Sequence, residues 1–144
     1  MKRIKVSDGT DILEVNLLDI LNSLSLKENI CWCLVWVEAF GNLRNHSIIE
    51  FEQEVNKLNT PKLIDLAGLI ELSKEKLQFI NLLLIGDENV QNIQTCYENK
   101  INIEPIVQYR IELLDSSYWL IETSDESFIK NILENFENVE FEKY

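Results

Sequence analysis

The residue types that carry most enzymatic chemistry are scarce in this sequence of 144 residues, which contains one histidine and three cysteines. A serine–histidine–aspartate site would have to use His46, yet no serine stands in the Gly-x-Ser-x-Gly turn that such sites often use. Cys31 and Cys33 belong to an apolar, strand-like run, and burial there opposes formation of a reactive thiolate. We therefore expect no histidine or cysteine catalysis.

Phosphate-binding loops and metal sites are not indicated either. Four glycines in the whole chain are too few for a Walker or dinucleotide-binding loop. A Cys-x-Cys pair without a second Cys/His cluster is a poor zinc signal. Glu50 and Glu54 share a predicted helical face, but Glu52 and Lys57 lie among them, as on any solvated face. We predict a protein without metal or cofactor that is not an enzyme, and we keep a small enzyme that uses carboxylates or a thiol as an alternative.

Charge is the most distinctive property of the sequence. The chain has 13 basic and 25 acidic residues, a formal net charge of -12. Nucleic acids and anionic lipids both bind through lysine and arginine, so this balance argues against either as a partner. Residues 98–144 hold eleven acidic and four basic residues, more than half of the excess. Two interpretations stay open: the charge serves solubility alone, or it forms an acidic face that steers a basic protein partner.

Candidate contact residues for such a partner lie in the last third of the sequence. Tyr118 and Trp119 follow a predicted turn, where an aromatic side chain can remain partly exposed and anchor an interface. For Trp119 two interpretations stay open, packing in the core, which an aromatic side chain more often adopts, and a contact role. The acidic candidates belong to the predicted C-terminal helix and strand and are Asp125, Glu126, Glu134, Glu137, Glu140 and Glu142.

Hydrophobic periodicity predicts the elements that position these residues. Helices are expected after Asn16, after Ser47, from Pro61 and after Ser124 or Asp125, because a capping residue or a first-turn proline precedes an apolar stripe there. Residues 90–97 are a candidate for a further short helix. Strands are expected over 2–6, 30–39, 79–85, 106–114, 118–122 and 139–141, with 11–14 as a candidate returning strand after an Asp-Gly turn signal.

The strand predicted over residues 30–39 is apolar on both faces. Strict alternation places Trp32, Leu34 and Trp36 on one face, and we expect both tryptophans to pack in the core. Together the patterns predict a single globular domain over 1–144. Its expected class is α+β, with a mostly antiparallel sheet of five or six strands and three or four helices packed around it.

Targeting segments are not predicted. The longest apolar run, residues 30–37, is too short to span a bilayer, and acidic residues interrupt the sequence after Met1-Lys2-Arg3. We expect a cytoplasmic protein.

Two segments carry a resemblance to small bacterial proteins: ICWCLVWVEAFG at residues 30–41 and DSSYWLI at residues 115–121. With its size and acidity, the chain also resembles immunity proteins of polymorphic or contact-dependent-inhibition toxin systems. That resemblance implies an acidic, cytoplasmic, non-enzymatic protein that covers the active site of a basic toxin domain, and it carries no site residues with it. We therefore expect a protein that neutralises a basic partner, namely a nuclease-type toxin. The alternatives are a phage-encoded acidic inhibitor of a host nuclease or defence complex, and a small regulatory subunit of a larger assembly.

Overall fold

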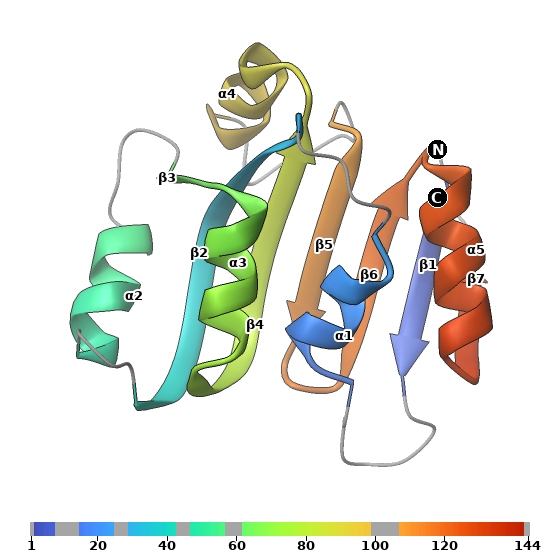
Figure 1. Cartoon of the computed structure of the whole chain (residues 1–144). Helices are drawn as coiled ribbons and strands as arrows, with labels where there is room; N and C mark the ends of the chain where they lie inside the picture. The colour runs from blue at the N-terminus through green and yellow to red at the C-terminus, as the bar shows by residue number, and fades with distance from the viewer. Residues whose placement is uncertain are drawn as a thin grey trace.

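A computed structural model describes residues 2–7, 15–24, 29–42, 47–56, 62–98 and 107–142, and within them it contains seven strands and five helices (Figure 1). The strands are β1 (Lys2–Ser7), β2 (Cys31–Asn42), β3 (Lys62–Ile64), β4 (Lys76–Asp87), β5 (Tyr109–Leu114), β6 (Tyr118–Thr123) and β7 (Asn138–Glu142). The helices are α1 (Leu17–Asn22), α2 (Ile48–Asn56), α3 (Leu66–Ser73), α4 (Val90–Glu98) and α5 (Glu126–Asn135). The predicted α+β class is confirmed, whereas the predicted numbers of strands and helices were too low.

All seven strands belong to one sheet with the order β3-β2-β4-β5-β6-β1-β7, and every neighbouring pair is antiparallel. The N-terminal strand β1 lies between β6 and β7, so the last third of the chain supplies both of its neighbours. The predicted returning strand over 11–14 lies outside the described residues, and the positions beside β1 are taken. Strand β3 was predicted as the start of a helix. Its three residues instead pair with Trp32, Cys33 and Leu34 of β2.

Helices α1, α3 and α5 cover one face of the sheet (Figure 1). Local capping explains where these helices begin. Asn16 and Asp19 form a reciprocal capping box at α1, and Asp65 and Asp125 accept hydrogen bonds from backbone amides in the first turns of α3 and α5. The predicted caps at Asn16 and Asp125 are thus confirmed. The core beneath these helices includes the sheet residues Ile4, Val6, Trp32, Leu34, Val37, Leu82, Leu84, Tyr109, Ile111, Trp119 and Ile121.

A smaller apolar cluster lies on the opposite face of the sheet, at one end. Helix α4, which matches the short helix considered for 90–97, packs its side chains Ile93, Cys96 and Tyr97 there. They contact sheet residues that point away from the main core, such as Cys33 and Ile85. Among the described helices, α4 is the one whose buried side chains belong to this cluster, so much of this sheet face has no helix of the described ranges on it.

A β-bulge in β2 separates the two tryptophans that the sequence pattern placed together. Leu34 pairs with Leu84 while Trp36 pairs with Leu83, so one extra residue, Val35, is inserted in β2. Strand residues before and after the bulge still reach the helix-side core, but Trp36 packs against the cluster on the opposite face. The prediction that Trp36 shares a core face with Trp32 is therefore wrong, because a single inserted residue reverses the alternation.

Candidate functional site

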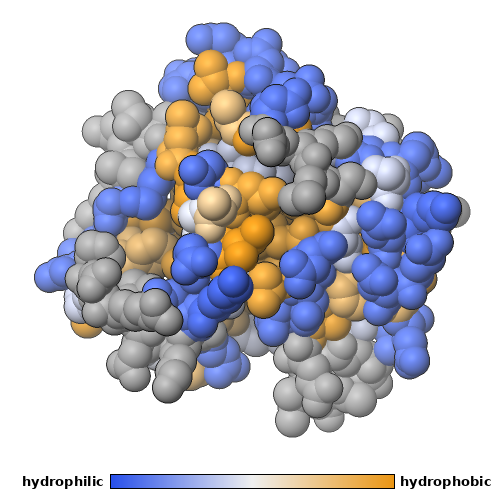
Figure 2. Space-filling model, in the orientation of Figure 1, coloured by the Kyte–Doolittle hydropathy of each residue, from blue (hydrophilic) through white to orange (hydrophobic). Residues whose placement is uncertain are grey.

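The structure divides the predicted contact residues between the two sides of the sheet. Glu140 and Glu142 stand opposite Lys5 and Arg3 of β1, on the face away from the helix-side core, and Tyr118 points to that same face from β6. Glu126 and Glu134 instead lie on the exposed surface of α5, on the helix side. Glu137 is exposed between α5 and β7. The surface over α5 is largely hydrophilic, whereas hydrophobic residues are visible towards the middle of the same view (Figure 2).

Two of the predicted contact residues, Trp119 and Asp125, have side chains that are engaged in contacts within the fold. The Trp119 side chain is 1% exposed, and its Nε1 donates a hydrogen bond to the Val15 carbonyl at 2.8 Å. The expectation of a surface anchor is therefore wrong for Trp119, which packs in the core. Asp125 is the N-cap of α5, where it accepts hydrogen bonds from the Ser127 and Phe128 amides and from the Tyr109 hydroxyl. Its carboxylate is thus engaged in holding the helix start.

Basic residues of β1 offset part of the acidic excess in the C-terminal third. Lys2 Nζ lies 3.6 Å from a Glu126 carboxylate oxygen, and Arg3 Nη2 lies 2.8 Å from Glu122 Oε1. Lys5 stands opposite Glu140, and its Nζ lies 4.5 Å from the centre of the Tyr118 ring. The net charge summed along residues 98–144 therefore overstates the negative charge of the surface that these residues form. The reason is that β1, with its basic residues, is inserted between β6 and β7.

An ion network crosses strands β1, β6 and β5 on the face away from the helix-side core. Glu122, with a side chain 2% exposed, is approached by Arg3 and by Arg110, whose Nη1 lies 3.5 Å from Glu122 Oε1. The same Nη1 lies 3.0 Å from Glu112 Oε1. Burial raises the pKa of the nearby Cys96 thiol, an effect that Arg110 opposes and Glu122 reinforces. Glu112 and Glu122, the two carboxylates of this network, thus each have an arginine partner, as buried charges generally require.

We call the sheet surface opposite α1, α3 and α5, outside the area under α4, the open face. Strand alternation places a mixed set of residues on it. Its half-buried or exposed apolar side chains are Trp36, Phe40, Leu114, Tyr118 and Leu120, and its exposed carboxylates are Glu38, Glu140 and Glu142. Aromatic side chains in reach of carboxylates are a common composition for a protein-binding surface.

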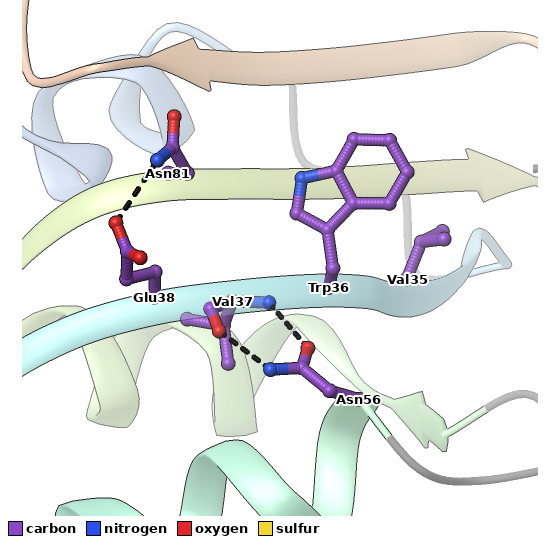
Figure 3. A pocket seen from close by; sticks show the side chains of 6 residues that line it. All are labelled: Val35, Trp36, Val37, Glu38, Asn56 and Asn81. Atoms are coloured by element: carbon purple, nitrogen blue, oxygen red, sulfur yellow. Dashed lines mark hydrogen bonds between the residues drawn. The ribbon is translucent and has the colours of Figure 1, made fainter. Parts of the chain in front are cut away.

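A pocket of about 420 Å³ lies at the β2 end of the open face, between β2, β4 and the last residue of α2 (Figure 3). It is lined by Val35, Trp36, Val37, Glu38, Asn56 and Asn81. Asn81 Nδ2 donates a hydrogen bond of 3.1 Å to Glu38 Oε1, and the Asp115 amide donates one of 2.9 Å to Asn81 Oδ1. The carboxylate of Glu38 is exposed, and no described lysine or arginine lies within ion-pair distance of it.

Side chains of α2 occupy the edge of β2 next to this pocket. Asn56 accepts a hydrogen bond from the Val37 amide and donates one to the Val37 carbonyl, both at 2.9 Å. Glu52 accepts a hydrogen bond of 2.8 Å from the Ala39 amide. The two side chains therefore take the place of a neighbouring strand beyond the end of β3, and they protect this edge from pairing with another chain.

Sequence reasoning missed the pocket because it placed Trp36 in the core and did not single out Glu38. His46 lies outside the described residues, so the structure does not bear on it. No group of three or more histidine, cysteine, aspartate or glutamate side chains within the described ranges is placed to hold a metal ion. In that same part of the chain, no helix has the length and apolar character needed to cross a membrane.

Comparison with known proteins adds no relative: the chain matches no family model, no curated protein sequence and no solved structure.

Proposed function

We propose that this protein is a non-enzymatic binding protein that neutralises a basic protein, in the manner of a bacterial immunity protein acting on a nuclease-type toxin domain. The observation that carries the proposal is the composition of the open face. Trp36 and Tyr118 are partly exposed on it, and Glu38 and Glu140 stand on the same surface. Aromatic side chains provide anchors in protein interfaces, and the carboxylates complement a basic partner electrostatically.

The dimensions of the open face support contact with a folded protein. It extends from β2 to β7, which are five strand spacings apart in the sheet, or about 24 Å at the usual spacing of strands. The extended surface of a sheet is also a rigid platform, so binding would require little ordering of backbone. Of the contact residues proposed from sequence, we keep Tyr118, Glu140 and Glu142, because they lie on the open face. We add Trp36 and Glu38 of the same face to them.

The buried carboxylates of the open face favour a structural role over acid–base catalysis. Glu112 and Glu122 are both engaged by Arg110, and Glu122 also by Arg3. A general acid or base needs a carboxylate that reaches the substrate in the right protonation state. Both carboxylates are instead paired with arginine, Glu112 with Arg110 and Glu122 with Arg110 and Arg3, which supports a binding protein over a small hydrolase.

The proposal is tested by identifying the partner and then measuring neutralisation. The tagged chain is used for affinity capture from the producing bacterium, and a captured basic protein is expressed alone and together with this chain. We expect growth arrest by the captured protein alone and growth when both are present. A captured protein that is harmless when expressed alone, or no stoichiometric partner, would contradict the proposal.

A matched pair of variants connects neutralisation to the open face. The double substitution Trp36→Ala with Tyr118→Ala removes two aromatic side chains from that face and leaves Phe40 in place. Glu126→Gln and Glu134→Gln together change the exposed surface of α5 on the other side of the sheet. We expect protection to be lost in the first double variant and retained in the second. The reverse pattern would move the interface to α5.

A further inference from the structure

We infer that the pocket at Trp36 and Glu38 binds the guanidinium group of an arginine side chain that the basic partner presents. This inference deepens the proposed function and rests on it for the identity of the partner. It gives the pocket a defined occupant, a planar cation, and it gives Glu38 and Trp36 separate roles in binding that cation. Asn81 is assigned the role of positioning the carboxylate.

The carboxylate of Glu38 has acceptor capacity left for a cation. It accepts one hydrogen bond, from Asn81 Nδ2 to Oε1, and no described basic side chain pairs with it. An ionised carboxylate offers about four lone-pair sites, so a guanidinium can still donate to both oxygens. Such charge-assisted, bidentate pairs are among the strongest hydrogen bonds in proteins.

The indole of Trp36 provides an aromatic wall beside that carboxylate. The β-bulge at Val35 directs Trp36 onto the open face, where it is half-buried and lines the same pocket as Glu38 (Figure 3). Guanidinium groups stack on aromatic faces, and a tryptophan ring is the best acceptor of a cation–π contact. An aromatic wall beside a carboxylate therefore suits the flat guanidinium group of arginine better than the compact ammonium group of lysine.

Hydrogen bonds to neighbouring strands hold the pocket in place. Asn81 is oriented by the amide of Asp115 in the tight turn between β5 and β6, where Asp115 and Ser116 have φ values of 50° and 55°. The Ser116 amide donates a hydrogen bond of 2.8 Å to the carbonyl of Ile80, which is the extra residue of a second register shift between β2 and β4. This chain of contacts orients Glu38 before any ligand binds, which lowers the cost of binding.

The charge around the pocket also favours a cation. Glu52 lies at the adjacent edge of β2, and Asp115 lies in the turn that holds Asn81. Neither carboxylate forms an ion pair with a described residue. Glu38, Glu52 and Asp115 therefore add negative charge at this end of the sheet, where the described Lys62 is paired with Glu54, whereas Lys5 and Arg3 make the opposite end of the open face more nearly balanced.

The test uses N-acetyl-arginine amide as the probe and N-acetyl-citrulline amide as its neutral counterpart of nearly the same shape. Each is titrated into the full-length ¹⁵N-labelled protein while the indole N–H and side-chain amide signals are followed. Trp36 and Asn81 report on the pocket, and the buried Trp32 and Trp119 are internal controls. We expect arginine to shift the Trp36 and Asn81 signals, and citrulline to bind about ten-fold more weakly.

Two variants separate the roles of the pocket residues. Glu38→Gln should weaken arginine binding about ten-fold and remove the preference over citrulline, because it deletes the charge and keeps the shape. Trp36→Leu should weaken binding about three-fold to ten-fold, followed through Asn81, and keep the preference. Glu134→Gln, an exposed change on α5, should leave binding unchanged.

Equal shifts with arginine and citrulline, or unchanged affinity in Glu38→Gln, would overturn the inference. Its failure is distinguishable from that of the proposed function. If the chain neutralises a captured basic protein while arginine leaves Trp36 unaffected, the pocket assignment is wrong and the function stands. If arginine binds as described but the captured partner is harmless, the proposed function is wrong and the site for a cation stands.

Discussion

Replacing Glu122 with glutamine should destabilise the protein strongly, although the two side chains have nearly the same shape. Glu122 Oε1 accepts a hydrogen bond of 3.0 Å from Arg3 Nε and lies 2.8 Å from Arg3 Nη2 and 3.5 Å from Arg110 Nη1. The Glu122 side chain is 2% exposed, whereas Arg3 is 29% and Arg110 is 13% exposed. The substitution therefore removes the central negative charge from between two arginines, one of which has little access to water.

The magnitude follows from what each arginine retains. Removing one partner of a buried ion pair costs about 3–5 kcal/mol when the remaining charge has no other partner. Here Arg110 keeps Glu112 at 3.0 Å, and Arg3 reaches solvent, so the cost should fall below that range. Hydrogen bonds to charged groups contribute about 1.5–3 kcal/mol each, and glutamine keeps one acceptor. We expect the free energy of unfolding to fall by about 2–3 kcal/mol.

Urea unfolding measures this change, and Glu126→Gln is the matched control. Glu126 is 74% exposed and lies 3.6 Å from Lys2 Nζ, so the same substitution there should cost less than about 0.5 kcal/mol. With a urea m-value of about 1–3 kcal/mol per molar, the midpoint for Glu122→Gln should fall by about 0.7–3 M. A midpoint shift no larger than that of Glu126→Gln would refute the reasoning that a buried, shared carboxylate stabilises this sheet.

Three further predictions concern stability and reactivity. Gly86→Ala should lower the free energy of unfolding by about 1–3 kcal/mol in urea titrations, because a Cβ there would lie 2.5 Å from a Trp32 ring carbon; an unchanged midpoint would contradict this. Asn56→Ala should cost about 1–2 kcal/mol in the same assay, since it leaves an amide and a carbonyl of β2 without partners; a loss below 0.5 kcal/mol would argue that water replaces the side chain. Native Cys96 should react with iodoacetamide at pH 8 at least about ten-fold more slowly than half-buried Cys31, as mapped by mass spectrometry, because burial raises the pKa of the Cys96 thiol and limits access; equal rates would contradict this.

Features that depend on neighbouring residues in the chain were predictable from sequence. Asn16 caps α1 through a capping box with Asp19, and Asp125 caps α5, as local hydrogen-bonding chemistry predicts. The long apolar runs were equally readable as the strands β2 and β4, because a near-continuous apolar run is typical of a central strand with buried residues on both faces.

Features that depend on distant parts of the chain were not predictable. Strand β3 is formed by pairing with β2 and has three residues, which are too few to show the alternating pattern of a strand in the sequence. The bulge at Val35 is a mismatch of register between β2 and β4, and no residue type in β2 announces it. Trp36 therefore changed from an expected core residue to a wall of the candidate site.

The acidic residues that lack a basic partner are distributed differently in the fold than the acidic residues are along the sequence. Along the chain it is concentrated after residue 97, but the basic residues of β1 pair with Glu122 and Glu126 and stand opposite Glu140. At the other end of the sheet, Glu38 has no such basic partner among the described residues and lies beside an aromatic ring. An unpaired carboxylate attracts a cation more strongly than a paired one, because a partner already in place screens its charge. We therefore expect the charge available to steer and bind the proposed basic partner to act at β2 more than at β7, although β7 lies in the most acidic third of the sequence.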